Sequence, residues 1–111
     1  MHIFTAGVFV FLTAATASAQ VQDGTYQPDR CDAGASDTRV VINGSSIRYH
    51  ETLCALTNPT SVRGMEGAVL YDAQCSGEGE TWSERVFMMP TAEGGFVQVR
   101  GGYGYTYQRC F

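Results

Sequence analysis

The sequence contains no lysine, and its seven basic residues are arginines that stand singly along the chain. Proteins that bind nucleic acid need clustered basic groups, which displace counterions from the phosphates. With eleven acidic residues, the chain has a formal net charge of -4 at pH 7. This composition excludes nucleic acid as a partner, and it favours a basic protein over an anionic lipid surface.

Long apolar runs and helical periodicity are also missing. No segment after residue 19 has apolar residues at the spacing of a helix face over about eleven residues, so we expect no helix beyond a turn. No run reaches the roughly 20 apolar residues that cross a bilayer, so we expect no membrane insertion. A chain of 111 residues fits a single domain.

The first 19 residues contain no Asp, Glu, Lys or Arg. An apolar run from Ile3 to Leu12 precedes Ala17-Ser18-Ala19, which matches the small-residue pattern of a cleavage site. Residues 1–19 are therefore interpreted as a secretory signal peptide, and residues 20–111 as one domain that begins near Gln20. We expect a soluble monomer that is periplasmic or secreted.

The cysteines form an even set in a chain that we expect to be exported, which predicts two disulfides among Cys31, Cys54, Cys75 and Cys110. A zinc site that also uses His50 is the alternative. Successive cysteine spacings of 23, 21 and 35 residues lack the tight ligand pairs of such sites. We therefore expect no metal and no other cofactor.

The favoured pairing joins Cys31 to Cys110 and Cys54 to Cys75. In a closed meander the first and last strands are neighbours, and Cys31 follows the first expected strand while Cys110 ends the last. Cys54 and Cys75 lie on consecutive expected strands. Cys31 with Cys54 and Cys75 with Cys110 remains open as the alternative pairing.

Strand signals follow one another along residues 20–111. A short strand is expected at Gly24 to Tyr26, and Asn43-Gly44 between residues 38–42 and 46–51 predicts a hairpin, because both turn positions accept positive φ. The apolar pattern continues past Cys54 until Asn58-Pro59 stops it, since proline removes a ladder donor. The remaining strands are expected at residues 68–75, 82–89, 96–100 and 103–110.

The fold class that follows is all-β, an antiparallel meander of about six to seven short strands curled into a small barrel or half-barrel with two disulfides. Strands this short leave an interior filled by side chains. Tyr103, Tyr105 and Tyr107 share one face of the last strand. We interpret this row, together with Trp82, as core or cross-strand packing, with an aromatic platform for a ligand as the alternative.

Residues that could carry catalysis are sparse. His50-Glu51 begins like a zinc-protease motif, but Cys54 stands where the second histidine belongs. Glu78 and Glu80 are expected on a solvated turn, where carboxylates make poor general acids. A Ser-His-Asp set would have to use His50, and no G-x-S-x-G motif accompanies it. We expect no enzymatic activity.

Several segments carry a resemblance: I-R-Y-H-E-T-L-C, V-R-G-M, Y-D-A-Q-C-S-G-E-G-E-T-W and the terminal Y-Q-R-C. Together they resemble a group of small, uncharacterised exported four-cysteine proteins of proteobacteria. The resemblance covers nearly all of residues 20–111 and implies no activity. More loosely, the G-x-Y opening and the short strands are similar in outline to the small β-barrels of periplasmic lysozyme and metalloprotease inhibitors, an analogy of fold and compartment alone.

These observations predict a non-enzymatic binding module, such as an inhibitor of a basic hydrolase, that acts through loops. We expect residues 58–65 and 77–81 to make the contacts. The candidate contact residues are Asn58, Arg63, Met65, Glu78 and Glu80. A small-molecule carrier of lipocalin type and a purely structural envelope protein are the alternatives, although the carrier needs a cavity for which so short a chain leaves little room.

Overall fold

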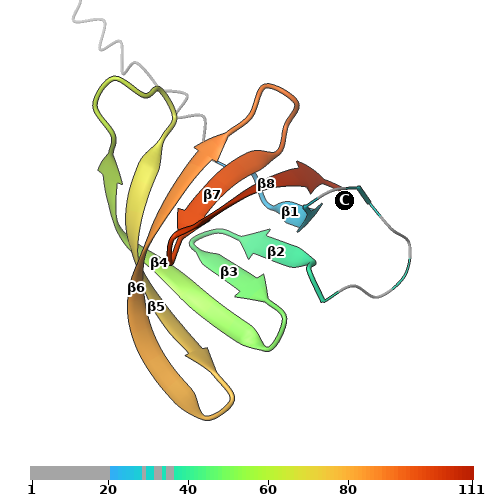
Figure 1. The fold of residues 1–111 in the computed structure, drawn as a ribbon, viewed down its shortest axis with the longest axis vertical. Coiled ribbons are helices and arrows are strands. Elements are labelled where there is room, and N and C mark those ends of the chain that lie inside the picture. The colour runs from blue at the N-terminus through green and yellow to red at the C-terminus, as the bar shows by residue number, and fades with distance from the viewer. Residues whose placement is uncertain (1–20, 29, 32–33, 35–36) are drawn as a thin grey trace, which may run out of the picture.

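A computed structural model describes residues 21–28, 30–31, 34 and 37–111, which form a closed antiparallel barrel (Figure 1). The expected signal peptide, residues 1–19, lies outside the described residues. The described residues contain no helix long and apolar enough to cross a membrane. The expected all-β class and the closure of the meander into a barrel are confirmed.

Eight strands follow one another around the barrel in sequence order. They are β1 Gly24–Gln27, β2 Val40–Asn43, β3 Ser46–Tyr49, β4 Thr52–Ser61, β5 Val69–Gly77, β6 Glu80–Pro90, β7 Phe96–Arg100 and β8 Tyr103–Arg109. Each strand pairs with the next, and β8 pairs with β1. Closure therefore removes the open sheet edges that a flat meander would expose.

The strand count is higher than expected because the chain turns at His50-Glu51. Glu51 has a φ of 59°, and β3 and β4 form a hairpin with Tyr49 opposite Thr52. Positive φ is uncommon for a residue other than glycine, so the sequence around Glu51 gives no turn signal comparable to Asn-Gly. The hairpin predicted at Asn43-Gly44 is confirmed.

β4 also runs further than expected. It continues through Asn58-Pro59 to Ser61, and its register against β5 shifts between Thr57 and Thr60. The prediction that Pro59 ends the strand is wrong, because the proline falls in this β-bulge and needs no ladder hydrogen bond there. Asn58 takes the bulge conformation with a φ of 51°.

The barrel closes where the short strand β1 meets β8. Tyr26 lies opposite Arg109, and the backbone N–H of Cys110 donates to the carbonyl of Thr25 over 2.6 Å. The Cys31–Cys110 disulfide joins this seam across a sequence separation of 79 residues. The first predicted disulfide is therefore confirmed, and it lies beside the pairing on which closure depends.

The interior is packed with side chains that alternate inward along the strands. Phe96 lies edge-on against Tyr26 and stacks on Tyr107, with ring centroids 4.9 and 4.7 Å apart. The second predicted disulfide, Cys54–Cys75, joins directly opposed residues of β4 and β5 in this core and is also confirmed. Two disulfides indicate an oxidising compartment outside the cytoplasm.

Candidate functional site at one end of the barrel

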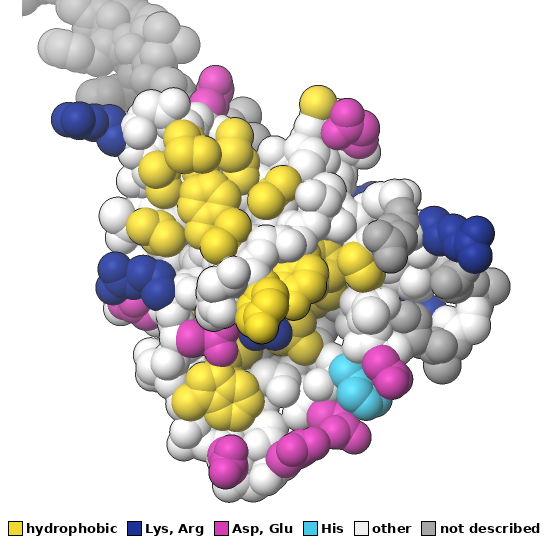
Figure 2. All heavy atoms as spheres, in the orientation of Figure 1, with side chains coloured by type: hydrophobic (Ala, Val, Ile, Leu, Met, Phe, Trp, Pro, Cys, Tyr) yellow, Lys and Arg dark blue, Asp and Glu magenta, His cyan; other side chains and the backbone are white. Residues whose placement is uncertain are grey.

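Alternate turns of an up-and-down barrel gather at the same end. The β3–β4, β5–β6 and β7–β8 turns therefore lie at one end, and the β4–β5 and β6–β7 turns at the other (Figure 1). Acidic side chains and a histidine line the first end (Figure 2). We term it the acidic end; its exposed carboxylates are Asp37, Glu51, Glu78 and Glu80.

The structure separates the predicted contact residues. Arg63 and Met65 lie in the β4–β5 turn, whereas Glu78 and Glu80 lie at the acidic end. β5, the strand between them, has nine residues and spans roughly 30 Å. The two expected loops therefore do not form one contact surface. The second is also shorter than expected, since Glu80 already belongs to β6.

Asn58 lies inside β4 instead of in a loop, and its side chain has structural partners. Its Nδ2 donates to Asp72 Oδ2 over 2.9 Å, and Arg85 donates to the other oxygen of the same carboxylate over 3.3 Å. The hydrogen bond from Asn58, assisted by the Arg85 charge, lowers the pKa of Asp72. These contacts give Asn58 a role in holding the bulge of β4 against β5.

Glu51 and Glu78 bring two carboxyl groups together at the acidic end. Gly77 allows the close approach of their turns, because a Cβ at this position would lie 2.5 Å from the carbonyl oxygen of Glu51. The hydrogen bond with Glu51 and the Glu51 charge raise the pKa of Glu78, while His50 lowers it. The two turns thus place two acidic groups side by side on an exposed surface. A bound cation would reduce the electrostatic repulsion between them.

His50 lies between two carboxylates of this group. Its Nδ1 is 3.7 Å from Asp37 Oδ1, and its Nε2 is 3.7 Å from Glu51 Oε1. His50 was expected within a strand at residues 46–51, but it lies in the β3–β4 turn, where it is exposed. Both ring nitrogens face acidic groups, so His50 belongs electrostatically to the acidic end.

Aromatic rings stand beside these carboxylates. Trp82 lies opposite the buried Cys75, and Tyr103 and Tyr105 alternate in step with the buried Tyr107, so all these rings belong to the inner face of the barrel. The exposed fractions are 37% for Trp82, 67% for Tyr103 and 41% for Tyr105. Burial in the core is found for Tyr107 and not for the other three, because β6 and β8 extend past the packed core at the acidic end.

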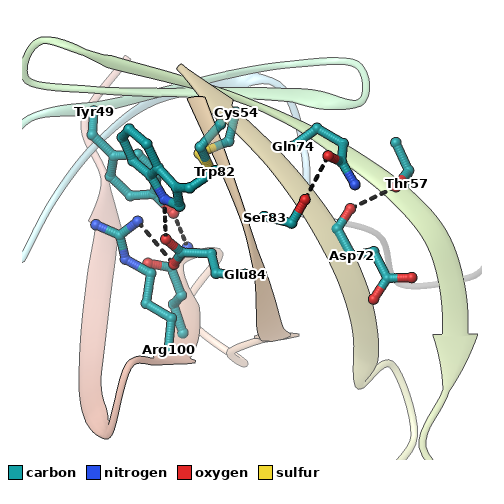
Figure 3. The surroundings of a disulfide bond; sticks show 11 residues. Tyr49, Cys54, Thr57, Asp72, Gln74, Trp82, Ser83, Glu84 and Arg100 are labelled. Carbon is teal, nitrogen blue, oxygen red and sulfur yellow. Dashed lines mark hydrogen bonds and ion pairs between the residues drawn. A yellow bond between two sulfur atoms is a disulfide. The ribbon is translucent and has the colours of Figure 1, made fainter. Parts of the chain in front are cut away.

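Charged and polar groups lie between the rings (Figure 3). Arg100 donates to Glu84 Oε1 over 3.3 Å, and its guanidinium lies 3.9 Å from the centroid of the Tyr49 ring. The indole N–H of Trp82 donates to Glu84 Oε2 over 2.7 Å. Gln98 donates to the Tyr49 hydroxyl over 2.6 Å. Burial raises the pKa of Tyr49 to about 12, so this hydroxyl stays protonated at neutral pH.

Two hollows of about 280 Å³ each open among these side chains. Both are lined by Thr52, Arg100 and Tyr105, so they adjoin; Trp82 and Tyr103 line one, and Tyr49 lines the other. We term the two hollows together the aromatic cleft. A further hollow of about 450 Å³ lies at the opposite end of the barrel, beside the β6–β7 turn.

A separate apolar patch covers part of the outer surface (Figure 2). Leu70, Phe87 and Val99 are neighbours across β5, β6 and β7, and Met89 lies opposite Val97 beside them. Phe87 and Trp82 stand on opposite faces of β6, since five positions separate them. The patch is therefore distinct from the aromatic cleft.

Tyr49, Glu84 and Arg100 are site residues that the sequence did not single out. Strand alternation could have identified Glu84, because Trp82 and Glu84 are two positions apart on one strand and therefore share a face. Comparison of the chain with protein-family models, curated proteins and solved structures finds no match. Functional inference therefore depends on the geometry of the acidic end and the aromatic cleft.

Proposed function

We propose that this protein is an exported, non-enzymatic binding module that recognises a basic protein partner, such as a basic hydrolase, with the acidic end of its barrel. The observation that carries the proposal is the exposed pair of carboxyl groups of Glu51 and Glu78. An arginine or lysine of a partner, placed between them, relieves their repulsion and gains two charge-assisted hydrogen bonds. The formal charge of -4 would also steer a basic partner during encounter.

The exposed rings beside these carboxylates supply the apolar part of such an interface. Tryptophan and tyrosine are enriched at binding hot spots because they bury a large area with few rotatable bonds. Trp82 is already oriented by its hydrogen bond to Glu84, so it loses little freedom on binding. Of the sequence-predicted contacts, Glu78 and Glu80 belong to this surface, whereas Arg63 and Met65 do not.

The second candidate is a small-molecule carrier of lipocalin type. Such a carrier holds its ligand inside the barrel, and here Tyr26, Ile47 and Phe96 occupy the interior. This packing favours the binding module. A purely structural envelope protein is the remaining alternative, and no contact at the acidic end favours it. Export to the periplasm or the medium is inferred from residues 1–19 together with the disulfides.

Calorimetry against a panel of basic secreted hydrolases, with acidic proteins of similar size as negative partners, tests the proposal. We expect micromolar or tighter binding to a basic partner that weakens as salt is raised. Replacing Glu78→Gln together with Glu80→Gln should weaken that binding about tenfold or more. The matched control is Glu66→Gln with Glu93→Gln, which removes the same charge at the opposite end and should leave affinity nearly unchanged.

Two outcomes would overturn the proposal. One is the absence of micromolar binding to every basic partner in the panel. The other is an equal loss of affinity in both double variants, because binding would then follow net charge and not the acidic end.

A further inference from the structure

The hollow lined by Trp82 and Tyr103 has two charged side chains, Glu84 and Arg100, and they are paired with each other. The adjoining hollow is also lined by Asp37, Arg39 and His50. One oxygen of Glu84 accepts a hydrogen bond from Arg100, and the other accepts one from Trp82. The Glu84 and Arg100 side chains are 26% and 27% exposed, so solvent reaches both without separating them. A paired site gives little net attraction to an anion or a cation, and instead presents fixed hydrogen-bonding groups.

Arg100 and Glu84 can each form further hydrogen bonds. Among the described residues, Arg100 donates one side-chain hydrogen bond, and a guanidinium has five N–H groups. Each Glu84 oxygen accepts one hydrogen bond in the structure and has a second lone pair. Donor and acceptor therefore lie next to each other in fixed positions. Neighbouring hydroxyl groups, which both donate and accept, match this arrangement.

The walls of the cleft are aromatic. Trp82 and Tyr103 line the same hollow, and the rings of Tyr103 and Tyr105 lie 6.5 Å apart between centroids with an interplanar angle of 29°. These exposed faces remain hydrated in the free protein, so covering them with an apolar surface is favourable. The fitting ligand thus has apolar faces, hydroxylated edges and no net charge.

A pyranose ring has this combination, because its C–H bonds form apolar faces and its hydroxyls point outward from the edge. Each hollow, at about 280 Å³, lies at the small end of the range for ligand pockets and suits one ring-sized unit. The hollows adjoin at Arg100 and Tyr105. We propose that the aromatic cleft binds a neutral oligosaccharide, with successive pyranose rings in the two hollows and Arg100 and Glu84 contacting their hydroxyls.

This site shares its exposed rings with the protein-binding surface proposed above, but the two proposals depend on different charged groups. The oligosaccharide contacts depend on Glu84 and Arg100, whereas the proposed protein contacts depend on the carboxylates of Glu51, Glu78 and Glu80. The Glu78→Gln with Glu80→Gln variant should therefore bind oligosaccharide with unchanged affinity. Absence of binding to basic proteins would contradict only the first proposal, and absence of oligosaccharide binding would contradict only the second.

The chain has one tryptophan, so fluorescence reports directly on the cleft. Titration of the mature protein with neutral chito-, cello- and malto-oligosaccharides should give a saturable change in Trp82 emission for at least one series. A chain of about two or three units should bind more tightly than the monosaccharide, because it occupies both hollows. Dissociation constants near the millimolar range would fit a shallow, solvent-exposed site.

Variants distinguish stacking on the rings of the cleft from nonspecific binding to exposed aromatic side chains. Tyr103→Ala should weaken binding about tenfold, and because this side chain is largely exposed the variant should fold. Tyr103→Phe keeps the ring and should bind like the original protein. Phe87→Ala removes an aromatic ring on the outer face of the strand that carries Trp82, and should leave oligosaccharide binding unchanged.

Several results would overturn the inference. One is the absence of a saturable signal for every neutral series at about 10 mM. Others are tighter binding of acidic or cationic oligosaccharides than of neutral ones, and equal weakening by Tyr103→Ala and Phe87→Ala. A signal that saturates with an arginine-rich peptide but with no sugar would make the cleft part of a protein contact instead.

Discussion

Glu84 of β6 and Arg100 of β7 form a 3.3 Å ion pair on the inner wall of the barrel. Arg85 and Asp72 form a pair of the same length on the outside. The side chains of the inner pair are about a quarter exposed, whereas Arg85 is 71% exposed. Because water and salt screen exposed charges, equal distances do not give equal interaction energies here.

Double-mutant cycles should separate the two pairs. For Glu84→Gln and Arg100→Gln we expect a coupling free energy of about 1 kcal/mol that persists when salt is raised. The cycle with Asp72→Asn and Arg85→Gln should give a smaller coupling that salt reduces further. Urea denaturation of each set at low and high salt measures both. Equal couplings with equal salt dependence would contradict the role assigned to shielding of the inner pair.

Tyr49 should make the protein sensitive to alkaline pH. Burial raises its pKa from 10.0 to about 12, so the unfolded chain loses this proton first as the pH rises. The associated stability is present below about pH 10 and is lost as the pH approaches 12, with an upper magnitude of about 2 to 3 kcal/mol. The free energy of unfolding, measured by denaturation between about pH 9 and pH 11.5, should fall.

Tyr49→Phe removes the titrating hydroxyl and provides the comparison. Its stability should fall less steeply over the same pH range. Buried Tyr26 and Tyr107 and the partly buried Tyr71, whose pKa values burial also raises, keep some of the slope. Parallel pH profiles for the variant and the original protein would show that Tyr49 is not the source of the effect.

Gly95, just before β7, should tolerate no side chain. A Cβ at this position would lie 1.9 Å from the carbonyl oxygen of Tyr107, which is backbone and cannot rotate away. We expect Gly95→Ala to destabilise the protein by about 3 kcal/mol through displacement of β7 from β8. Gly104→Ala is the control, since the nearest atom to its Cβ is 3.9 Å away. Thermal melts that place both variants at the same midpoint would refute this account.

The two disulfides should differ in what they stabilise. Replacing Cys31 and Cys110 by serine frees a chain segment of 79 residues and should reduce stability by about 4.5 kcal/mol, mainly at the seam between β1 and β8. Replacing Cys54 and Cys75 by alanine opens a loop of 21 residues and should lose about 3 kcal/mol from chain entropy alone.

Hydrogen exchange can locate these losses. In the first variant, protection should fall first in β1, because few hydrogen bonds hold that strand to β8. In the second, the loss should be spread over the core around β4 and β5. Uniform loss of protection in the first variant would argue against a weak seam.

Local sequence patterns determined the main features of this fold. Asn43-Gly44 marked a hairpin, in which Gly44 takes a positive φ of 60° while Asn43 ends β2 opposite Ser46. Alternation along residues 103–107 placed three tyrosines on one face. Closure of a strand meander brings its ends together, and this made the Cys31–Cys110 pairing predictable. The turn at Glu51 was not predictable, because a glutamate there adopts a positive φ that its side chain does not favour. The bulge at Asn58 was not predictable because it depends on the register of β4 against β5.

The depth of each side chain along the barrel was decided only by the tertiary structure. Alternation tells which face a residue occupies, but it does not tell where the packed core ends, so Tyr107 is buried while Tyr103 on the same face is open to solvent. The contacts of Arg100 with Glu84 and Tyr49 join the consecutive strands β6 and β7 to β3, which is distant in sequence. The Glu51–Glu78 pair likewise exists because two turns meet across Gly77. Proximity of this kind follows from barrel closure and strand register, which no single segment encodes.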